Sequence, residues 1–177
     1  EKTGRTGALP YIGQAWYRNE FSLTDFDENK KVILLFEGAM SEPKVYINGE
    51  KVGEWNYGYS YFYFDITKFV QANRKNTIAI QVSNKGLSSR WYPGAGIYRK
   101  VQLIIKNKES IDQWGTFIST PYVRSELAKV NVKTKVSGQN LQIITKILDA
   151  QGIEVASNSS STVFGKEFEQ NIAINNP

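Results

Sequence analysis

The sequence predicts an all-β protein built from two successive β-sandwiches, and three observations support that fold class. Apolar and polar residues alternate with a period of two over most of the chain, which is typical of strands with one buried face. Turn residues separate these segments at intervals of about 8–12 residues, the spacing of antiparallel sandwiches. Hydrophobic residues make up 41% of the chain and aromatic residues 13%, which favours a packed core over disorder.

The first part of the chain shows the strongest strand signals. Residues 32–37 (VILLFE) form a near-continuous apolar run, which predicts a strand buried on both faces. Residues 44–48 lead into Asn48-Gly49, the strongest short signal for a β-hairpin. Further strands are predicted at residues 16–23, 51–53, 61–66, 77–83 and 100–106, with one helical turn at residues 67–72 capped by Thr67 or Asp65.

A long segment between the last two of these strands reads as a loop. Residues 84–99 (NKGLSSRWYPGAGIYR) are rich in glycine and carry a tryptophan and two tyrosines. Ordered loops of this length are usually functional rather than neutral connectors. Because the aromatic residues favour order, we expect this loop to have a function.

The polar stretch at residues 106–112 (KNKESID) predicts a boundary, with one domain over residues 1–112 and a second over residues 113–177. Strands of the second domain are predicted at residues 114–119, 128–136, 141–148, 153–156 and 168–174, with a break at Thr120-Pro121 and a serine-rich loop at Asn158-Ser159-Ser160. The second domain is shorter than the ~100 residues of a complete sandwich, so we expect it to be truncated. The chain also opens at Glu1 without a methionine, which indicates a piece of a longer protein.

The composition excludes several chemistries. The chain has no His and no Cys, so it contains no Ser-His-Asp triad, no Cys-His pair, no disulfide and no ordinary zinc site. Asp25, Asp27 and Asn29 resemble the start of a calcium loop, but the Gly and Glu that complete such a loop are missing. We therefore expect no metal site in this chain.

Carboxylate chemistry is the main catalytic option left. Glycoside hydrolysis needs two carboxyl groups about 5–9 Å apart, one with a raised pKa. Among the 17 acidic residues, Glu37, Glu54 and Asp65 lie nearest to the aromatic segments, yet no motif singles them out. Such residues more often belong to turns and caps, so the sequence assigns no catalytic residue.

The formal charge of +5 raises the possibility of a nucleic-acid partner. The basic residues are dispersed, however, and form no Lys/Arg run or recognisable module, which favours an ordinary solvated surface over phosphate binding. No stretch approaches the ~18 apolar residues needed to span a bilayer. We therefore expect neither nucleic acid nor membrane as a partner.

Several aromatic residues fall in predicted loops. Trp55, Tyr57, Tyr59 and Trp91 are placed where their rings could stay exposed and stack on the faces of sugars. The alternative is that these rings pack across the edge of the sheet as the core of a loop. The sequence leaves both interpretations open.

Five blocks of the sequence resemble the N-terminal sugar-binding domain of glycoside hydrolase family 2, with bacterial β-galactosidases as the most similar members. The blocks are TGALPYIGQAWYRNEF (6–21), VYINGEKVGEW (45–55), GYSYFYFDITKFV (58–70), NTIAIQVSN (76–84) and SRWYPGAGIYRKVQL (89–103). The segment from Trp114 is similar to the start of the immunoglobulin-like domain that follows in this family. The resemblance implies a jelly-roll β-sandwich followed by a partial immunoglobulin-like β-sandwich.

The resemblance also implies what the chain lacks. Both catalytic glutamates of the family belong to a (β/α)8 barrel that follows these two domains. The chain has one Asn-Glu pair like the family's acid/base motif, Asn19-Glu20, but it lies within a strand of the wrong domain. The resemblance thus implies the non-catalytic part of a retaining glycosidase, with no cofactor in this chain and any divalent or monovalent cation held by the barrel.

In this family the loop before Gly-Ile-Tyr-Arg helps to shape the sugar pocket, which points to Arg90, Trp91 and Tyr92. The alternative is that Arg90 and Trp91 pack at a domain interface. Some β-galactosidases use a carboxylate of this loop to hold the sugar and a cation, but residues 84–99 contain no Asp or Glu. Arg99 is expected to form a buried pair with Asp65 or Glu37.

The expected partners are the chain's own barrel and a galactoside-like carbohydrate, while the oligomeric state is left open. Two other functions stay open, an autonomous carbohydrate-binding module and a structural or interaction sandwich. The absence of cysteine fits a periplasmic and a cytoplasmic bacterial protein equally well.

Overall fold

The computed structural model describes residues 13–24, 26–27, 29–84, 96–162 and 167–177. The chain divides into two compact units, Glu1–Lys106 and Asn107–Pro177. Strands dominate both units, and the described part contains one short 3-10 helix, η1 (Thr67–Phe69). The all-β class expected from the sequence is therefore confirmed.

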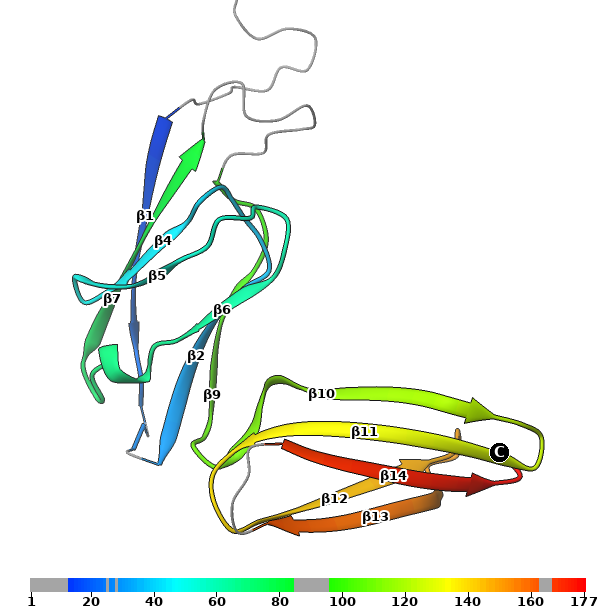
Figure 1. Ribbon diagram of the computed structural model, residues 1–177. Helices are drawn as coiled ribbons and strands as arrows, with labels where there is room; N and C mark the ends of the chain where they lie inside the picture. The colour runs from blue at the N-terminus through cyan, green and yellow to red at the C-terminus, as the bar shows by residue number, and fades with distance from the viewer. Residues whose placement is uncertain (1–12, 25, 28, 85–95, 163–166) are drawn as a thin grey trace, which may run out of the picture. The chain divides into compact units, whose positions relative to one another are not determined.

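The first unit is a sandwich of two antiparallel sheets (Figure 1). One sheet has the strand order β1 (Gly13–Ser22), β7 (Lys75–Asn84), β4 (Lys44–Ile47) and β5 (Glu50–Glu54). The other has the order β6 (Phe62–Asp65), β2 (Lys30–Phe36) and β9 (Val101–Asn107), and the short strands β3 (Ala39–Met40) and β8 (Gly96–Ile97) pair separately. Most neighbouring strands are not consecutive along the chain, which is the crossing connectivity of jelly-roll sandwiches.

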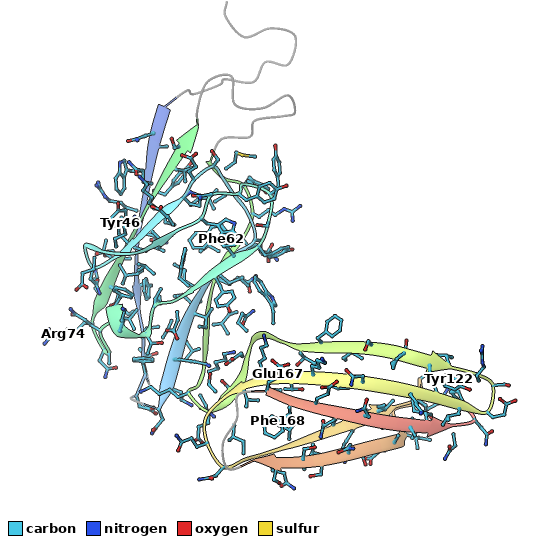
Figure 2. All side chains as sticks on the ribbon, viewed as in Figure 1. Tyr46, Phe62, Arg74, Tyr122, Glu167 and Phe168 are labelled. Carbon is cyan, nitrogen blue, oxygen red and sulfur yellow. The ribbon has the colours of Figure 1, made fainter. Side chains whose placement is uncertain are left out.

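An apolar core fills the space between the two sheets. Phe62 of β6, labelled in Figure 2, stacks on Phe36 of β2 with ring centroids 4.6 Å apart. Every residue from Val32 to Phe36 is buried, so the run predicted to be covered on both faces is confirmed. The remaining buried members of this cluster are Leu23, Ala39, Val45, Ile47, Ile66, Ile80 and Val82.

The β4–β5 hairpin turns at Asn48-Gly49 as predicted. Both residues have positive φ, 52° and 86°, as a tight two-residue hairpin requires. The Asn48 side chain donates to the carbonyl of Phe69 and to the side-chain oxygen of Asn76, both at 2.9 Å. These bonds tie the hairpin tip to the end of η1 and to the start of β7.

The second unit is a smaller sandwich. Its larger sheet has the order β10 (Ser110–Val123), β11 (Leu127–Ser137) and β14 (Glu167–Asn175), and its smaller sheet pairs β12 (Leu141–Leu148) with β13 (Glu154–Thr162). The strict alternation predicted over residues 128–136 is confirmed, because Ala128, Val132, Thr134 and Val136 are buried. They share the interior with Phe168 (Figure 2) and Ile172 of β14.

A buried amide joins the two sheets of the second unit. Gln170 of β14 is 2% exposed, and its oxygen accepts a bond of 2.5 Å from the Thr145 hydroxyl. Its nitrogen donates to the carbonyls of Ile143 at 3.2 Å and Asn158 at 3.3 Å. A buried amide is tolerated because its hydrogen-bonding capacity is used.

Two local predictions were wrong in the second unit. The strand expected to break at Thr120-Pro121 continues as β10, with a register shift between Ser119 and Tyr122. A proline fits there because β10 is an edge strand with a bulge at that point. The serine-rich tract at Asn158-Ser159-Ser160 is part of β13, where it pairs with β12. β10 begins at Ser110.

Candidate functional site

The most exposed group of rings lies between β5 and β6. We call residues 55–61 the aromatic loop; its exposed rings belong to Trp55, Tyr57, Tyr59 and Tyr61. Tyr57 is 59% exposed and Tyr59 50%, and their rings meet edge to face with centroids 5.8 Å apart. The sequence indicated the first three residues but assigned Tyr61 to a strand. A signal for it existed, since every second residue from 55 to 63 is aromatic.

Trp55 belongs to the loop's own core as well as to its surface. Its indole N–H donates to the Ser60 hydroxyl at 3.1 Å, and its backbone N–H donates to the Pro43 carbonyl at 3.1 Å. Its ring stacks on buried Phe62 at 5.6 Å and an interplanar angle of 12°. Trp55 thus packs within the loop and is also 38% exposed, while Tyr57 and Tyr59 are more exposed.

The second candidate region contacts the aromatic loop through Tyr98. The Tyr98 hydroxyl donates to the Gly58 carbonyl at 2.8 Å, and Gly58 itself is buried. A Cβ at Gly58 would lie 2.5 Å from the sulfur of Met40, so glycine allows the close approach. Arg90, Trp91 and Tyr92 lie outside the residues that the structure describes. The C-terminal end of their loop is nevertheless anchored to the aromatic loop.

Arg99 is exposed, so the buried pair predicted for it is wrong. Its guanidinium lies 5.8 Å from the centre of the Tyr98 ring. The Glu37 carboxylate accepts from the Gln102 side chain at 2.7 Å, and the Asp65 carboxylate accepts from the backbone N–H of Thr67 at 2.9 Å. The two proposed partners thus have local roles, and Asp65 fixes the start of η1.

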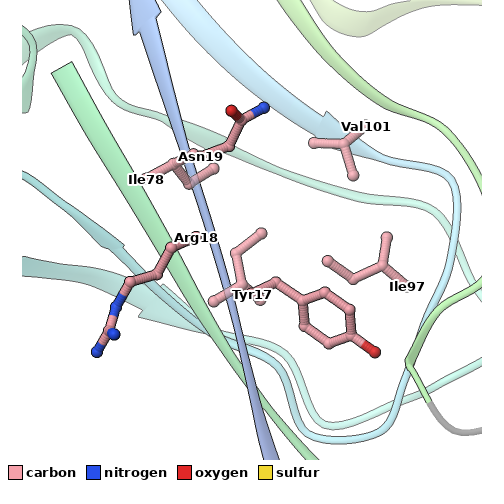
Figure 3. Close-up of a pocket in the computed structure, with 7 residues that line it drawn as sticks. Tyr17, Arg18, Asn19, Ile78, Ile97 and Val101 are labelled. Atoms are coloured by element: carbon pink, nitrogen blue, oxygen red, sulfur yellow. The ribbon is translucent and has the colours of Figure 1, made fainter. Parts of the chain in front are cut away.

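A hollow of about 270 Å³ opens between β1 and β9 (Figure 3). Its lining residues are Tyr17, Arg18, Asn19, Ile78, Ile80, Ile97 and Val101. Figure 3 shows Arg18 pointing away from the other labelled side chains, so its charge does not enter the hollow. The lining offers the Tyr17 hydroxyl and the Asn19 amide on an apolar wall but no carboxyl group. The hollow can hold an apolar group, and it has no acid-base pair.

The resolved carboxyl shifts run opposite to those of a catalytic acid. Hydrogen bonds from Lys51 and Lys146 lower the pKa of Glu54 and Glu154, and the Ser125 hydroxyl lowers the pKa of Glu126. A general acid for glycoside hydrolysis needs a raised pKa instead. These three carboxylates are suited to surface pairing.

Within the described ranges, no group of three or more acidic side chains is arranged to hold a metal ion. The same part of the chain contains no helix long and apolar enough to cross a membrane. Neither observation assigns a further site.

Comparison with known proteins identifies relatives over almost the whole chain. Residues 7–107 match the family model for the sugar binding domain of glycosyl hydrolases family 2. The chain is 35% identical to the β-galactosidase BoGH2A of Bacteroides ovatus over 97% of its own length and 21% of that protein. It is 34% identical to a putative β-glucuronidase of Formosa agariphila, over 88% of the chain and 15% of that protein.

Solved structures give the same result. A glycosyl hydrolase family 2 member from Bacteroides cellulosilyticus superposes with a TM-score of 0.83 and 31% identity, covering 93% of this chain and 24% of the other. A β-glucuronidase from glycoside hydrolase family 2 superposes with a TM-score of 0.85 and 27% identity, covering 94% and 21%. The chain therefore spans about a fifth of the length of the relatives it matches.

Proposed function

Because the chain belongs to glycosyl hydrolase family 2, we propose that it is the non-catalytic N-terminal part of a β-galactosidase-type enzyme. The observation that carries this proposal is the 35% identity to a β-galactosidase over 97% of the chain, which covers only 21% of that enzyme. In this proposal the catalytic carboxyl groups belong to a barrel domain in the remaining length. The first unit supports that domain and lines one side of its active site.

The aromatic loop and the loop that carries Arg90, Trp91 and Tyr92 together form the proposed lip of the active site. The bond from Tyr98 to Gly58 supports this grouping, because it holds one end of the second loop against the first. Outward rings such as Tyr57 and Tyr59 suit contact with the apolar face of a sugar. Arg90 would donate hydrogen bonds to sugar hydroxyls.

Hydrolysis assays on two proteins test the proposal. The 177-residue chain should not hydrolyse a nitrophenyl β-galactoside, whereas the full-length parent should. The proposal would be overturned if the chain alone hydrolysed the substrate and a single Glu→Gln substitution abolished that activity. A parent that cleaves the nitrophenyl β-glucuronide but not the galactoside would replace the galactoside by the substrate class named for the Formosa agariphila relative.

The lip is tested separately in the full-length parent. Arg90→Ala or Trp91→Ala should raise KM about tenfold, equivalent to about 1.4 kcal/mol, with a smaller change in kcat. Trp114→Ala is the matched control, because Trp114 is an exposed tryptophan of the other unit. An unchanged kcat/KM in Arg90→Ala and Trp91→Ala would leave a structural or interaction role for this loop.

A second candidate function is autonomous carbohydrate binding, favoured by the exposure of the Tyr57 and Tyr59 rings. It predicts that the isolated chain binds galactose or a galacto-oligosaccharide with submillimolar affinity in calorimetry. Tyr57→Ala should then abolish binding. If calorimetry detects no binding at millimolar sugar, the proposed function of the chain is to support the catalytic domain.

A further inference from the structure

The outward face of the β1-β7-β4-β5 sheet carries a second group of aromatic and polar side chains, which stand on β1, β4 and β7 rather than in the aromatic loop. Ile78, Ile80 and Val82 of β7 face the core, so Ala79 and Gln81 between them face outward. The strand register places Trp16 and Lys44 beside Gln81, and Arg18 and Tyr46 beside Ala79. We call Trp16, Arg18, Lys44, Tyr46 and Gln81 the outer platform.

Two rings form the centre of the outer platform. The Trp16 and Tyr46 centroids are 5.5 Å apart with planes inclined by 40°, and Trp16 is 47% exposed. Ala79 lies between Arg18 and Tyr46 in the register and adds only a methyl group, and Tyr46 itself is half-buried. Both rings stand on paired strands, which gives a more rigid support than a loop.

Two side-chain amides and a guanidinium border the two rings. The Gln81 side chain donates to the Gln14 carboxamide oxygen at 2.8 Å, which fixes the orientation of both amides. The Arg18 guanidinium lies 5.8 Å from the Trp16 ring, and it points to the side of β1 opposite the hollow in Figure 3. A planar aromatic surface bordered by amides and a guanidinium matches a sugar ring, which has apolar faces and a polar rim.

The charges on this face select the kind of sugar. Among the described residues of this face, Glu54 pairs with Lys51 at 2.7 Å and also attracts Lys44, and Glu20 pairs with Lys75 at 2.9 Å. Arg18 and Lys44 therefore leave an excess of positive charge around the two rings. A guanidinium binds carboxylates in a bidentate manner, so the complementary ligand is anionic.

From this arrangement we propose that the outer platform binds a carboxylated saccharide, with a sugar ring on Trp16 and its carboxylate held by Arg18 and Lys44. This surface is separate from the lip of the proposed function and does not depend on it. The competing interpretation is a cross-strand ladder of Trp16, Tyr46 and Arg18 that only stabilises the sheet. The two interpretations differ in whether a ligand binds.

Calorimetry of the 177-residue chain with an oligogalacturonide, at low salt, tests the proposal. A galactan oligosaccharide of equal length is the neutral probe, and poly-glutamate is the anionic probe without sugar rings. We expect binding of the oligogalacturonide alone, weakened by added salt because charge contributes. No binding of it, or equal binding of either control ligand, would overturn the proposal.

Variants locate the binding surface. Trp16→Ala and Arg18→Gln should each weaken binding about tenfold, and Trp16→Phe should restore most of it. Lys133→Gln of the second unit matches the charge change of Arg18→Gln, and Tyr57→Ala removes a ring of the aromatic loop; both should bind normally. If Trp16→Ala impairs folding, as its unfolding midpoint would show, Arg18→Gln decides alone. Loss on Tyr57→Ala instead would move the site to the aromatic loop and overturn the proposal.

Discussion

The two units are both β-sandwiches, but different interactions hold their sheets together. The first unit has one continuous apolar cluster centred on Phe36 and Phe62. The second has fewer buried apolar side chains and places the hydrogen-bonded amide of Gln170 between its sheets. Apolar burial is non-directional, whereas a buried amide requires defined partners. The comparison indicates that apolar burial holds the sheets of the first unit together, whereas the second unit also depends on hydrogen bonds with defined partners.

Removing the central ring of the first unit should have the largest effect. Phe62 is 1% exposed, so Phe62→Ala loses a buried ring and leaves a cavity, at a cost of about 3–5 kcal/mol. Hydrogen exchange resolved by strand should show faster exchange in β2 and β7 and unchanged exchange in β11 and β14. Phe117→Ala, an exposed phenylalanine of β10, should change stability by less than about 0.5 kcal/mol. Equal loss of protection in both units would contradict a cavity effect confined to the first unit.

Removing the buried amide should have the next largest effect, confined to the second unit. Gln170→Ala leaves the Thr145 hydroxyl and the Ile143 carbonyl without their partner, which should cost about 2–3 kcal/mol. Denaturant unfolding measures this loss. Gln142→Ala is the control, because that exposed amide bonds only across the surface to Ser159. A stabilising Gln170→Leu variant would show that the amide network does not hold the sheets together.

A smaller effect is expected from the contact that anchors the two loops of the first unit. Tyr98→Phe removes the bond to the Gly58 carbonyl and should cost about 1 kcal/mol. Faster exchange of the amides between Trp55 and Tyr61 would be the local signature. Tyr122→Phe, an exposed tyrosine of the second unit, serves as control. Unchanged hydrogen exchange in Tyr98→Phe would show that the bond from Tyr98 does not stabilise the aromatic loop.

The surface ion pairs should have the smallest effect in either unit. Lys146 lowers the pKa of Glu154 below 4.5, and Glu154 raises the pKa of Lys146 above 10.5. The carboxylate contribution is therefore present above pH 4.5 and is lost as the pH falls through the lowered pKa. The lysine contribution is present below pH 10.5 and is lost as the pH rises beyond it. Glu154→Gln should slightly lower Tm at pH 7 and low salt, and a pH-independent difference would contradict this origin.

Local signals predicted much of the first unit. The apolar run at residues 32–37 and the Asn48-Gly49 turn reflect the burial and backbone geometry of a few adjacent residues, and both appear as expected. Trp55, Tyr57 and Tyr59 were expected in a loop, whereas Tyr61 was assigned to a strand although every second residue from 55 to 63 is aromatic. Features of this kind can be predicted from the sequence without knowledge of the fold.

The errors arose where pairing between distant segments decides the structure. The strand at Thr120-Pro121 continues because β11 pairs on both sides of the bulge, and Ser159 becomes a strand residue because it pairs with Ile144. Arg99 is exposed, and Glu37 and Asp65 bond to Gln102 and Thr67. The outer platform was missed for the same reason, since only the register brings Trp16 beside Tyr46.

The hairpin tip has a consequence for the chemical ageing of the protein. Asn-Gly pairs deamidate when the following backbone nitrogen attacks the side-chain amide, and here that amide donates to the Phe69 carbonyl and the Asn76 side-chain oxygen. Conversion of Asn48 to a carboxylate would replace a donor by a negative acceptor facing two other acceptors. Deamidation during storage should therefore weaken the hydrogen bonds of the β4–β5 hairpin tip. Peptide mapping would detect it as a mass increase at residue 48.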